Sequence, residues 1–266
     1  LIADCQYADQ DNVGEQHYRL SKQKLADALI EINKEDVDLT VQLGDLIDRD
    51  EKSYDDILPI FDHLNNELIH VLGNHDFIVS PKIQSKVPKI LSLTKDYHSR
   101  VLNNTRLIFL NGTDISLSAY PENSDKFKEA TEYHQQHAAD RVQWGGALSE
   151  QQFSWFENEL AAAQSLHERI IIFCHYPVYP THRHNLWDDE RIVSLVKKYP
   201  VTAWINGHNH QGNYGELHGC HYLTLDAMVE TDENSFAILN FNEDHLDVKG
   251  FGRQKSYSFP WVTYIL

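Results

Sequence analysis

The strongest constraint on this fold is a carboxylate that directly follows a short apolar run. Residues 39–43 (LTVQL) predict a buried strand, and Gly44 and Asp45 come immediately after it. Ligands of α/β sheets gather at the carboxyl ends of strands, so Asp45 is placed to meet one. Because a carboxylate has two oxygens, it can bridge two cations, and we interpret Asp45 as such a bridge. For this pair alone, a simple Gly-Asp turn is the alternative.

Four other segments repeat the pattern of an apolar run that ends in a metal-binding residue type. They are Asp4 and Gln6 near the start, Asn74 after residues 68–72, His175 after residues 169–174, and His208 and His210 after residues 202–205. Carboxylates, amides and imidazoles are ordinary ligands of divalent cations. Because each candidate follows a separate strand, the pattern predicts that these side chains form one metal site.

The segments between these motifs predict alternating strands and helices over the first 80 residues. Ser21 can cap a helix whose apolar positions are Leu25, Leu29 and Ile32, spaced by four and three residues. Such alternation is typical of a largely parallel sheet covered by helices. Short β runs after residue 215 predict antiparallel strands that complete a second sheet. We therefore expect an α/β fold.

The stretch from residue 81 to residue 148 is less regular. It contains a predicted strand at 106–110 and a second at 115–120. Residues 122–146 are polar, and two readings stay open for them: an insertion over the site, or a helix and loop at the surface. Neither a linker nor a repeat is visible. We expect a single domain over residues 1–266, with an irregular insertion around 81–148.

Charge and cysteine content exclude several classes of partner. A formal net charge of −17 argues against nucleic acid or anionic membrane, since both select basic surfaces. No apolar run approaches the roughly 20 residues that span a bilayer. Three cysteines give no disulfide framework and fit a reducing compartment, so we expect a cytoplasmic protein. Separately, we expect a monomer. Cys5 and Cys174 lie beside proposed ligands, and we favour small buried residues over a thiol nucleophile.

The five segments together resemble a known family. In chain order, D-x-Q, GDxxDR, GNHD, a lone histidine and GHxH resemble the calcineurin-like metallophosphoesterases, over residues 1 to about 210. The resemblance implies a two-sheet β-sandwich flanked by helices, in αββα layers, and two divalent ions. Two such ions, about 3.5–4 Å apart, supply an activated water and neutralise phosphoryl oxygens.

The family's ligands can be transferred to this chain residue by residue. The resemblance implies that one ion is held by Asp4, Gln6, Asp45 and His210, and the other by Asp45, Asn74, His175 and His208. His75 would contact the phosphate and help to protonate the leaving oxygen. Asp76 would orient His75, as carboxylates commonly do for imidazoles. Arg49 would steady either a phosphate or the loop at Asp48.

Gln6 departs from the usual pattern, because most of the family has histidine there. A neutral amide oxygen is a weaker and harder donor than imidazole, which favours Mn²⁺ or Mg²⁺ over Zn²⁺. One interpretation is a degraded site in a non-catalytic relative, and the other is the choice of a subfamily. The complete set of remaining ligands favours the second.

Further motifs narrow the resemblance to one subfamily. Residues 4–9 (DCQYAD), 145–152 (GGALSEQQ), 175–180 (HYPVYP) and 207–214 (GHNHQGNY) are similar to manganese-dependent ADP-ribose/CDP-alcohol diphosphatases. This implies cleavage of a nucleoside diphosphate-linked substrate into a nucleoside monophosphate and a phosphorylated sugar or alcohol. The implied cation is Mn²⁺, with Mg²⁺, Fe or Zn²⁺ as alternatives. The rival functions are another phosphodiesterase of the superfamily and a non-catalytic scaffold.

Aromatic residues near the proposed ligands could stack on a nucleotide base. The candidates are Tyr7, Phe77, Tyr176, Tyr179 and Trp187. For each of them taken alone, a core position is favoured over a stacking surface. His182 and His184 follow His175 closely in the chain and are further candidates for the lining of a substrate pocket. We expect a small nucleotide as the partner of this site.

Overall fold

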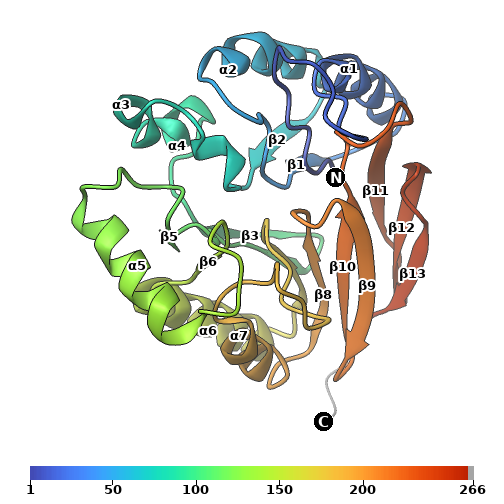
Figure 1. Cartoon of the computed structure of the whole chain (residues 1–266). Helices are drawn as coiled ribbons and strands as arrows, with labels where there is room; N and C mark the ends of the chain where they lie inside the picture. Colours follow the sequence, from blue (N-terminus) through green and yellow to red (C-terminus); the bar gives the residue numbers. More distant parts are fainter. Residues whose placement is uncertain (263–266) are drawn as a thin grey trace.

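The computed structural model describes residues 1–262 of the 266-residue chain. Two β-sheets lie at its centre (Figure 1). The first sheet has the strand order β3 (His98–Leu102), β4 (Thr105–Phe109), β7 (Arg169–Phe173), β8 (Val201–Asn206), β10 (Cys220–Asp226) and β9 (Gln211–Leu217). Its four inner strands are mutually parallel, and both edge strands pair antiparallel.

The second sheet is assembled from two groups of strands through the start of the chain. The groups are the parallel pair β1 (Leu39–Gln42) and β2 (Glu67–His70), and the antiparallel set β11 (Ser235–Phe241), β12 (His245–Gly252) and β13 (Tyr257–Pro260). The N–H of Ile2 donates to the carbonyl of Val41 at 3.0 Å, and the N–H of Ala237 donates to the carbonyl of Leu1 at 3.0 Å. Residues 1–3 therefore act as the strand that joins the two groups.

Helices cover the outer face of each sheet. On the second sheet these are α1 (Leu20–Ile32), α2 (Lys52–Ile57) and the 3-10 helix η1 (Leu58–His63); on the first they are α6 (Glu150–Ser165) and α7 (Asp189–Val196). Figure 1 shows α1 and α2 at one end of the molecule and α6 and α7 at the other. The predicted αββα layers are confirmed.

Strand β7 shows why both sheets are apolar on two faces. Successive side chains of a strand point to opposite sides, so Ile171 and Phe173 pack between the sheets while Ile170 and Ile172 pack under α6 and α7. A parallel strand buried on both faces reads as a continuous apolar run. That run is the reason why the sequence alone located β7.

The middle of the chain is more ordered than expected. The hairpin β3–β4 belongs to the first sheet, so an irregular insertion spanning 81–148 is too wide a description. What lies outside the sheets is α3 (Pro81–Gln84), α4 (Val87–Ile90), β5 (Ile115–Ser116), α5 (Asp125–His137) and β6 (Gly146–Ala147). The polar stretch 122–146 thus contains a helix, which Ser124 caps by accepting from the N–H of Phe127 at 3.1 Å.

Two predicted helix starts have different outcomes. Ser149 caps α6 as expected, because its hydroxyl accepts from the N–H of Gln152 at 3.2 Å. Ser21 is not a cap: it lies inside α1, which begins after Arg19 without a side-chain cap. The hydroxyl of Ser21 is buried, and helix α1 is held instead by its apolar stripe.

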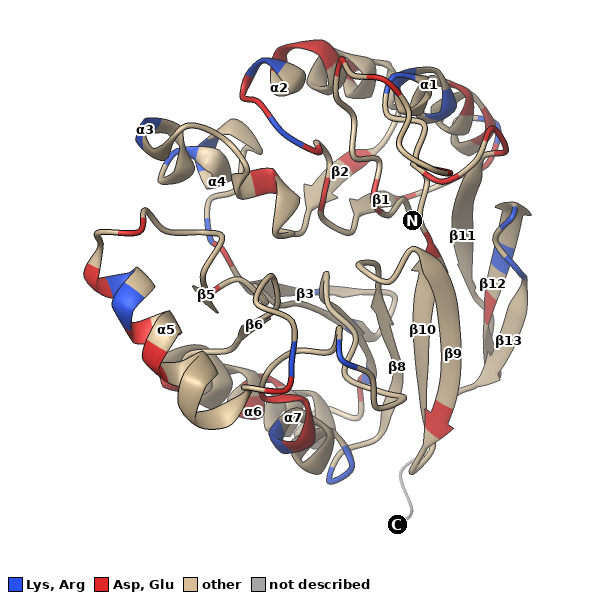
Figure 2. Cartoon of the chain, in the orientation of Figure 1, with Lys and Arg blue, Asp and Glu red and all other residues tan. Residues whose placement is uncertain are grey.

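The surface carries its negative charge unevenly. Figure 2 shows lysines on α3 and α4, whereas acidic residues line the loops beside α1 and α2.

Within residues 1–262, no helix is both long enough and apolar enough to cross a membrane.

Candidate metal centre

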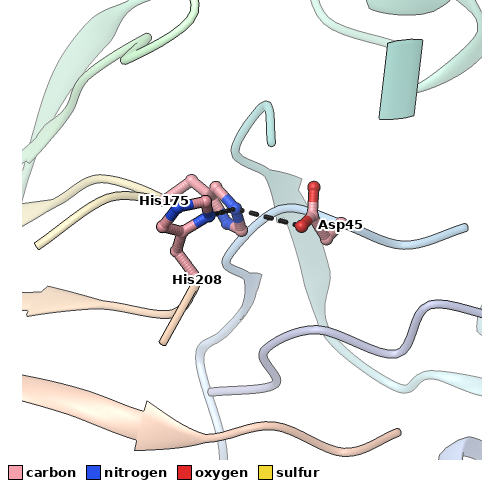
Figure 3. A group of neighbouring side chains, drawn as sticks. All are labelled: Asp45, His175 and His208. Carbon is pink, nitrogen blue, oxygen red and sulfur yellow. Dashed lines mark hydrogen bonds and ion pairs between the residues drawn. The ribbon is translucent and has the colours of Figure 1, made fainter. Parts of the chain in front are cut away.

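The proposed metal ligands converge at one edge of the sandwich. Six of the seven candidate ligands are buried, namely Asp4, Gln6, Asp45, Asn74, His175 and His208. The seventh, His210, has 17% of its side chain exposed. Figure 3 shows Asp45, His175 and His208 turned toward one another. One ligand atom from each of these three lies within 4.8 Å of those of the other two. Loops that are far apart in the sequence therefore bring these polar side chains together in one cluster.

Asp45 lies between two groups of candidate ligands. The first group contains Asp4, Gln6 and His210, and the second contains Asn74, His175 and His208. Its Oδ2 atom is 3.3 Å from Nε2 of Gln6 on one side and 3.2 Å from Nε2 of His175 on the other. Its second oxygen, Oδ1, accepts from the N–H of His75 at 2.7 Å. This backbone contact holds the carboxylate in place. Oδ2 of Asp45 therefore contacts a candidate ligand from each of the two groups.

The second group of ligands is fixed by the protein backbone. Nδ1 of His175 donates to the carbonyl of Leu43 at 2.8 Å, and this bond orients the ring so that Nε2 faces Asp45. Nδ1 of His208 lies 3.2 Å from that same Nε2. The N–H of His208 donates to both oxygens of Asp4 at 3.1 Å, which links this group to the first.

The first group of ligands is more open and depends on a carboxylate behind it. Nε2 of His210 is 3.0 Å from Nε2 of Gln6 and 3.9 Å from Oδ1 of Asp4. The other ring nitrogen of His210, Nδ1, is 2.7 Å from Glu230 and 3.2 Å from Nε2 of Gln16. Such a carboxylate orients a metal-binding imidazole and raises its basicity. Sequence reasoning missed the roles of both Glu230 and Gln16.

The backbone is strained at this edge. Four of the candidate ligands have positive φ angles: Asp4 (49°), Gln6 (42°), Asp45 (53°) and His208 (68°). Residues other than glycine rarely adopt this conformation, which costs on the order of 1–3 kcal/mol each and clusters at functional sites. Glycines allow the close approach: a Cβ on Gly73 would lie 2.3 Å from Oδ1 of Asp45.

The chemistry of the pocket fits divalent cations. Oε1 of Gln6 and Oδ1 of Asn74 are buried without a hydrogen-bond partner among residues 1–262, a state that costs about 1–3 kcal/mol per atom. Burial raises the pKa of Asp4 to about 6 and so opposes its negative charge. Cations relieve both penalties. The mixed set of oxygen and nitrogen donors suits Mn²⁺.

His75 is oriented by a residue other than the one predicted. Its Nδ1 lies 3.1 Å from both the carbonyl oxygen and Oδ1 of Asp48. Burial lowers the pKa of His75, but the nearby carboxylates of Asp45 and Asp48 outweigh this effect and raise it to about 9. Asp48 also pairs with the guanidinium of Arg49. Of the two roles predicted for Arg49, the structure thus shows the contact with the Asp48 loop.

Asp76 does not touch the imidazole of His75, and the role predicted for it is wrong. Its carboxylate accepts backbone N–H groups from Asp45 at 3.0 Å, Leu46 at 3.0 Å and Gly73 at 2.9 Å. All three donors are backbone N–H groups, and none of the contacts of this carboxylate is with the imidazole of His75. Asp76 instead ties together the two loops that carry Asp45 and Asn74.

Most of the aromatic residues proposed as base platforms belong to the core. Tyr7 and Phe77 are buried in the cluster beneath α1 and α2, and Trp187 is buried beside α5 with its Nε1 donating to Val142 at 2.9 Å. The interpretation of these three residues as base platforms is wrong. Burying an aromatic ring in the core is more favourable than leaving it exposed to water. Tyr179 is half-buried and packs on Tyr222, with ring centroids 5.2 Å apart.

Two further aromatic rings lie close to the candidate ligands: His184, which was proposed for a substrate pocket, and Trp144, which was missed. The ring centroid of His184 lies 5.6 Å from that of His208 and 5.8 Å from that of Trp144. His182 stacks on His184 at 5.1 Å. Trp144 escaped notice because it ends a polar stretch with no strand pattern.

The cysteines are not nucleophiles. All three are free and buried. Burial raises the pKa of Cys5, and it raises those of Cys174 and Cys220 to about 12, so the reactive thiolate is absent at neutral pH. The interpretation of Cys5 and Cys174 as small buried residues is confirmed.

Comparison with known proteins gives consistent matches over the whole chain. Residues 1–212 match the family described as Calcineurin-like phosphoesterase. Manganese-dependent ADP-ribose/CDP-alcohol diphosphatase of Danio rerio is 29% identical, over 99% of this chain and 97% of its own length, and that of Mus musculus is 27% identical, over 95% and 90%. The crystal structure of a dimetal phosphatase from Danio rerio superimposes with a TM-score of 0.87 at 26% identity, covering 98% of this chain and 97% of that one.

Proposed function

Because the chain belongs to the calcineurin-like phosphoesterase family, we propose that it hydrolyses the pyrophosphate of ADP-ribose or of CDP-alcohols. The products would be a nucleoside monophosphate and a phosphorylated sugar or alcohol. The observation that carries this proposal is the position of Asp45, whose Oδ2 lies between Gln6 and His175 and can serve two cations. The similarity to diphosphatases over nearly the full length supports the choice of substrate class.

We propose manganese as the cation at both positions. Asp4, Gln6, Asp45 and His210 would hold one ion, and Asp45, Asn74, His175 and His208 the other. When bound, the ions would supply a nucleophilic water at neutral pH and neutralise charge on the phosphoryl oxygens. The amide donors Gln6 and Asn74 support a cation that prefers oxygen, and the relatives named above are manganese-dependent.

His75 is the residue of this chain best placed to move a proton. Asp48 holds its Nδ1, which leaves Nε2 for the substrate, and 27% of its side chain is exposed at the pocket. During hydrolysis the water oxygen joins one phosphorus while the bond from that phosphorus to the bridging oxygen breaks. The leaving phosphate oxygen then takes a proton from Nε2, as in general acid catalysis.

The proposal is tested with purified protein and Mn²⁺. We expect release of AMP from ADP-ribose or of CMP from CDP-choline, measured by liquid chromatography, and no release in excess EDTA. Turnover of bis-p-nitrophenyl phosphate or cyclic nucleotides alone would show that the substrate class is wrong. Metal binding without turnover of any phosphodiester would favour a non-catalytic scaffold.

A further inference from the structure

Trp144 is exposed in a way that its hydrophobicity does not explain. Its exposed fraction is 47%, whereas Trp187, Trp204 and Trp261 are buried and Trp155 is half-buried. An indole is among the largest apolar side chains, and leaving one in water forgoes part of the gain from burial. The exposed part of this indole is therefore available to a ligand.

The position of Trp144 points to the metal centre. Its indole packs against the ring of His184, and His184 packs against the ring of His208, one of the candidate ligands. The hydroxyl of Tyr176 donates to the carbonyl of Trp144 at 3.4 Å, and the ring of Tyr176 lies 4.6 Å from that of His208. Two residues, His184 and Tyr176, thus each contact both Trp144 and the candidate ligand His208.

Two loops hold Trp144 in place. The N–H of Trp187 donates to the carbonyl of Gly146 at 2.7 Å, and the N–H of Val142 donates to the carbonyl of Arg183 at 3.2 Å. Gly145 lies directly over the buried Trp187, since a Cβ on Gly145 would be 2.6 Å from Nε1 of that indole. The backbone at Gly145 therefore packs closely on Trp187, while the neighbouring side chain of Trp144 is exposed. A surface fixed before binding loses little entropy when a ligand arrives.

We infer that Trp144 is the stacking surface for the base of the nucleotide substrate, with the sugar lying over His184. This inference rests on the proposed function, because it places the phosphates at the metal centre. In a nucleoside diphosphate the base is separated from the phosphates by the ribose, just as His184 separates Trp144 from His208. A purine covers more of an indole than a pyrimidine does, so Trp144 favours adenine over cytosine nucleotides.

Tryptophan fluorescence tests the contact without requiring turnover. The protein loaded with Mn²⁺ is titrated with AMP, CMP and ribose 5-phosphate. We expect AMP to quench more than CMP, and ribose 5-phosphate to have no effect. Trp144→Phe should remove the quenching, whereas Trp155→Phe, a matched change at the half-buried indole that packs on Tyr97, should retain it.

Inhibition of hydrolysis gives a second readout. Trp144→Ala should raise the inhibition constant of AMP about tenfold, equivalent to about 1.4 kcal/mol, because the base loses the aromatic ring on which it stacks. The inhibition constant of inorganic phosphate should stay the same. Trp144→Phe keeps an aromatic ring and should lie between the wild type and the alanine variant.

The outcomes separate this inference from the proposed function. Quenching that depends on Trp144, in a protein that cleaves no diphosphate, would uphold the stacking surface and refute the proposed activity. Cleavage of ADP-ribose with AMP quenching unchanged in Trp144→Phe would overturn the stacking surface alone. Equal changes in the constants for AMP and phosphate would also overturn it, since they indicate a disturbed metal centre.

Discussion

The two groups of ligands around Asp45 are built differently. His175 and His208 are buried, and a backbone carbonyl fixes the ring of His175. On the other side, Gln6 offers a neutral amide and His210 is partly exposed, with Glu230 behind its ring. Imidazole is the stronger donor, and burial limits ligand motion. From this comparison we expect a tighter cation site with His175 and His208 and a looser one with Gln6 and His210, and we expect the looser site to depend on Glu230.

Removal of the shared ligand should have the largest effect, because it abolishes the difference between the two sites. Asp45→Ala should lose both cations and reduce turnover by at least about a thousandfold, the upper range for a single electrostatic contact. Elemental analysis should show the metal content falling from two ions to near none. Retention of one ion would mean that Asp45 serves a single site.

Loss of the proton donor should separate catalysis from metal binding at both sites. His75→Ala should lower turnover about 10²–10⁴-fold, the usual contribution of a general acid. Both ions should stay bound, because the side chain of His75 contacts Asp48 and no ligand side chain. Loss of metal in this variant, measured by elemental analysis, would show that His75 has been assigned the wrong role.

A change behind His210 should weaken only the looser site. Glu230→Gln should lower metal affinity there about 10–100-fold, the usual cost of losing such a supporting carboxylate. Titration with Mn²⁺ should then show one weakened step and one unchanged step. Glu233→Gln, at an exposed carboxylate three residues further on, is the control and should change neither. Equal weakening of both steps would contradict the assignment of Glu230 to one site.

Replacing the amide should make the two sites more alike, and this is the smallest expected effect. Gln6→His should shift the preference of the looser site from Mn²⁺ toward Zn²⁺ or Fe, changing the ratio of activities with Zn²⁺ and Mn²⁺ by about tenfold. The measurement is turnover of one substrate with each metal in turn. An unchanged metal dependence would refute the donor argument for Gln6.

The sequence by itself determined the candidate ligand set and the layers of the fold. Asp4, Asp45, Asn74, His175 and His208 each follow an apolar run, which the chain shows without any long-range information. The continuous apolar run of β7 likewise indicated a strand buried on both faces. Local pattern suffices here because a strand end fixes where the next side chain goes.

Only the tertiary structure decided which residues support those ligands and which aromatic side chain stays exposed near them. Asp48 rather than Asp76 holds His75, Glu230 holds His210, and Trp144 rather than Trp187 remains exposed. These outcomes depend on competition among neighbours brought together from distant segments. Asp76 accepts hydrogen bonds from backbone N–H groups, and Trp187 is buried in an apolar cluster. Such competition for hydrogen bonds and burial has no signature within a few residues of sequence.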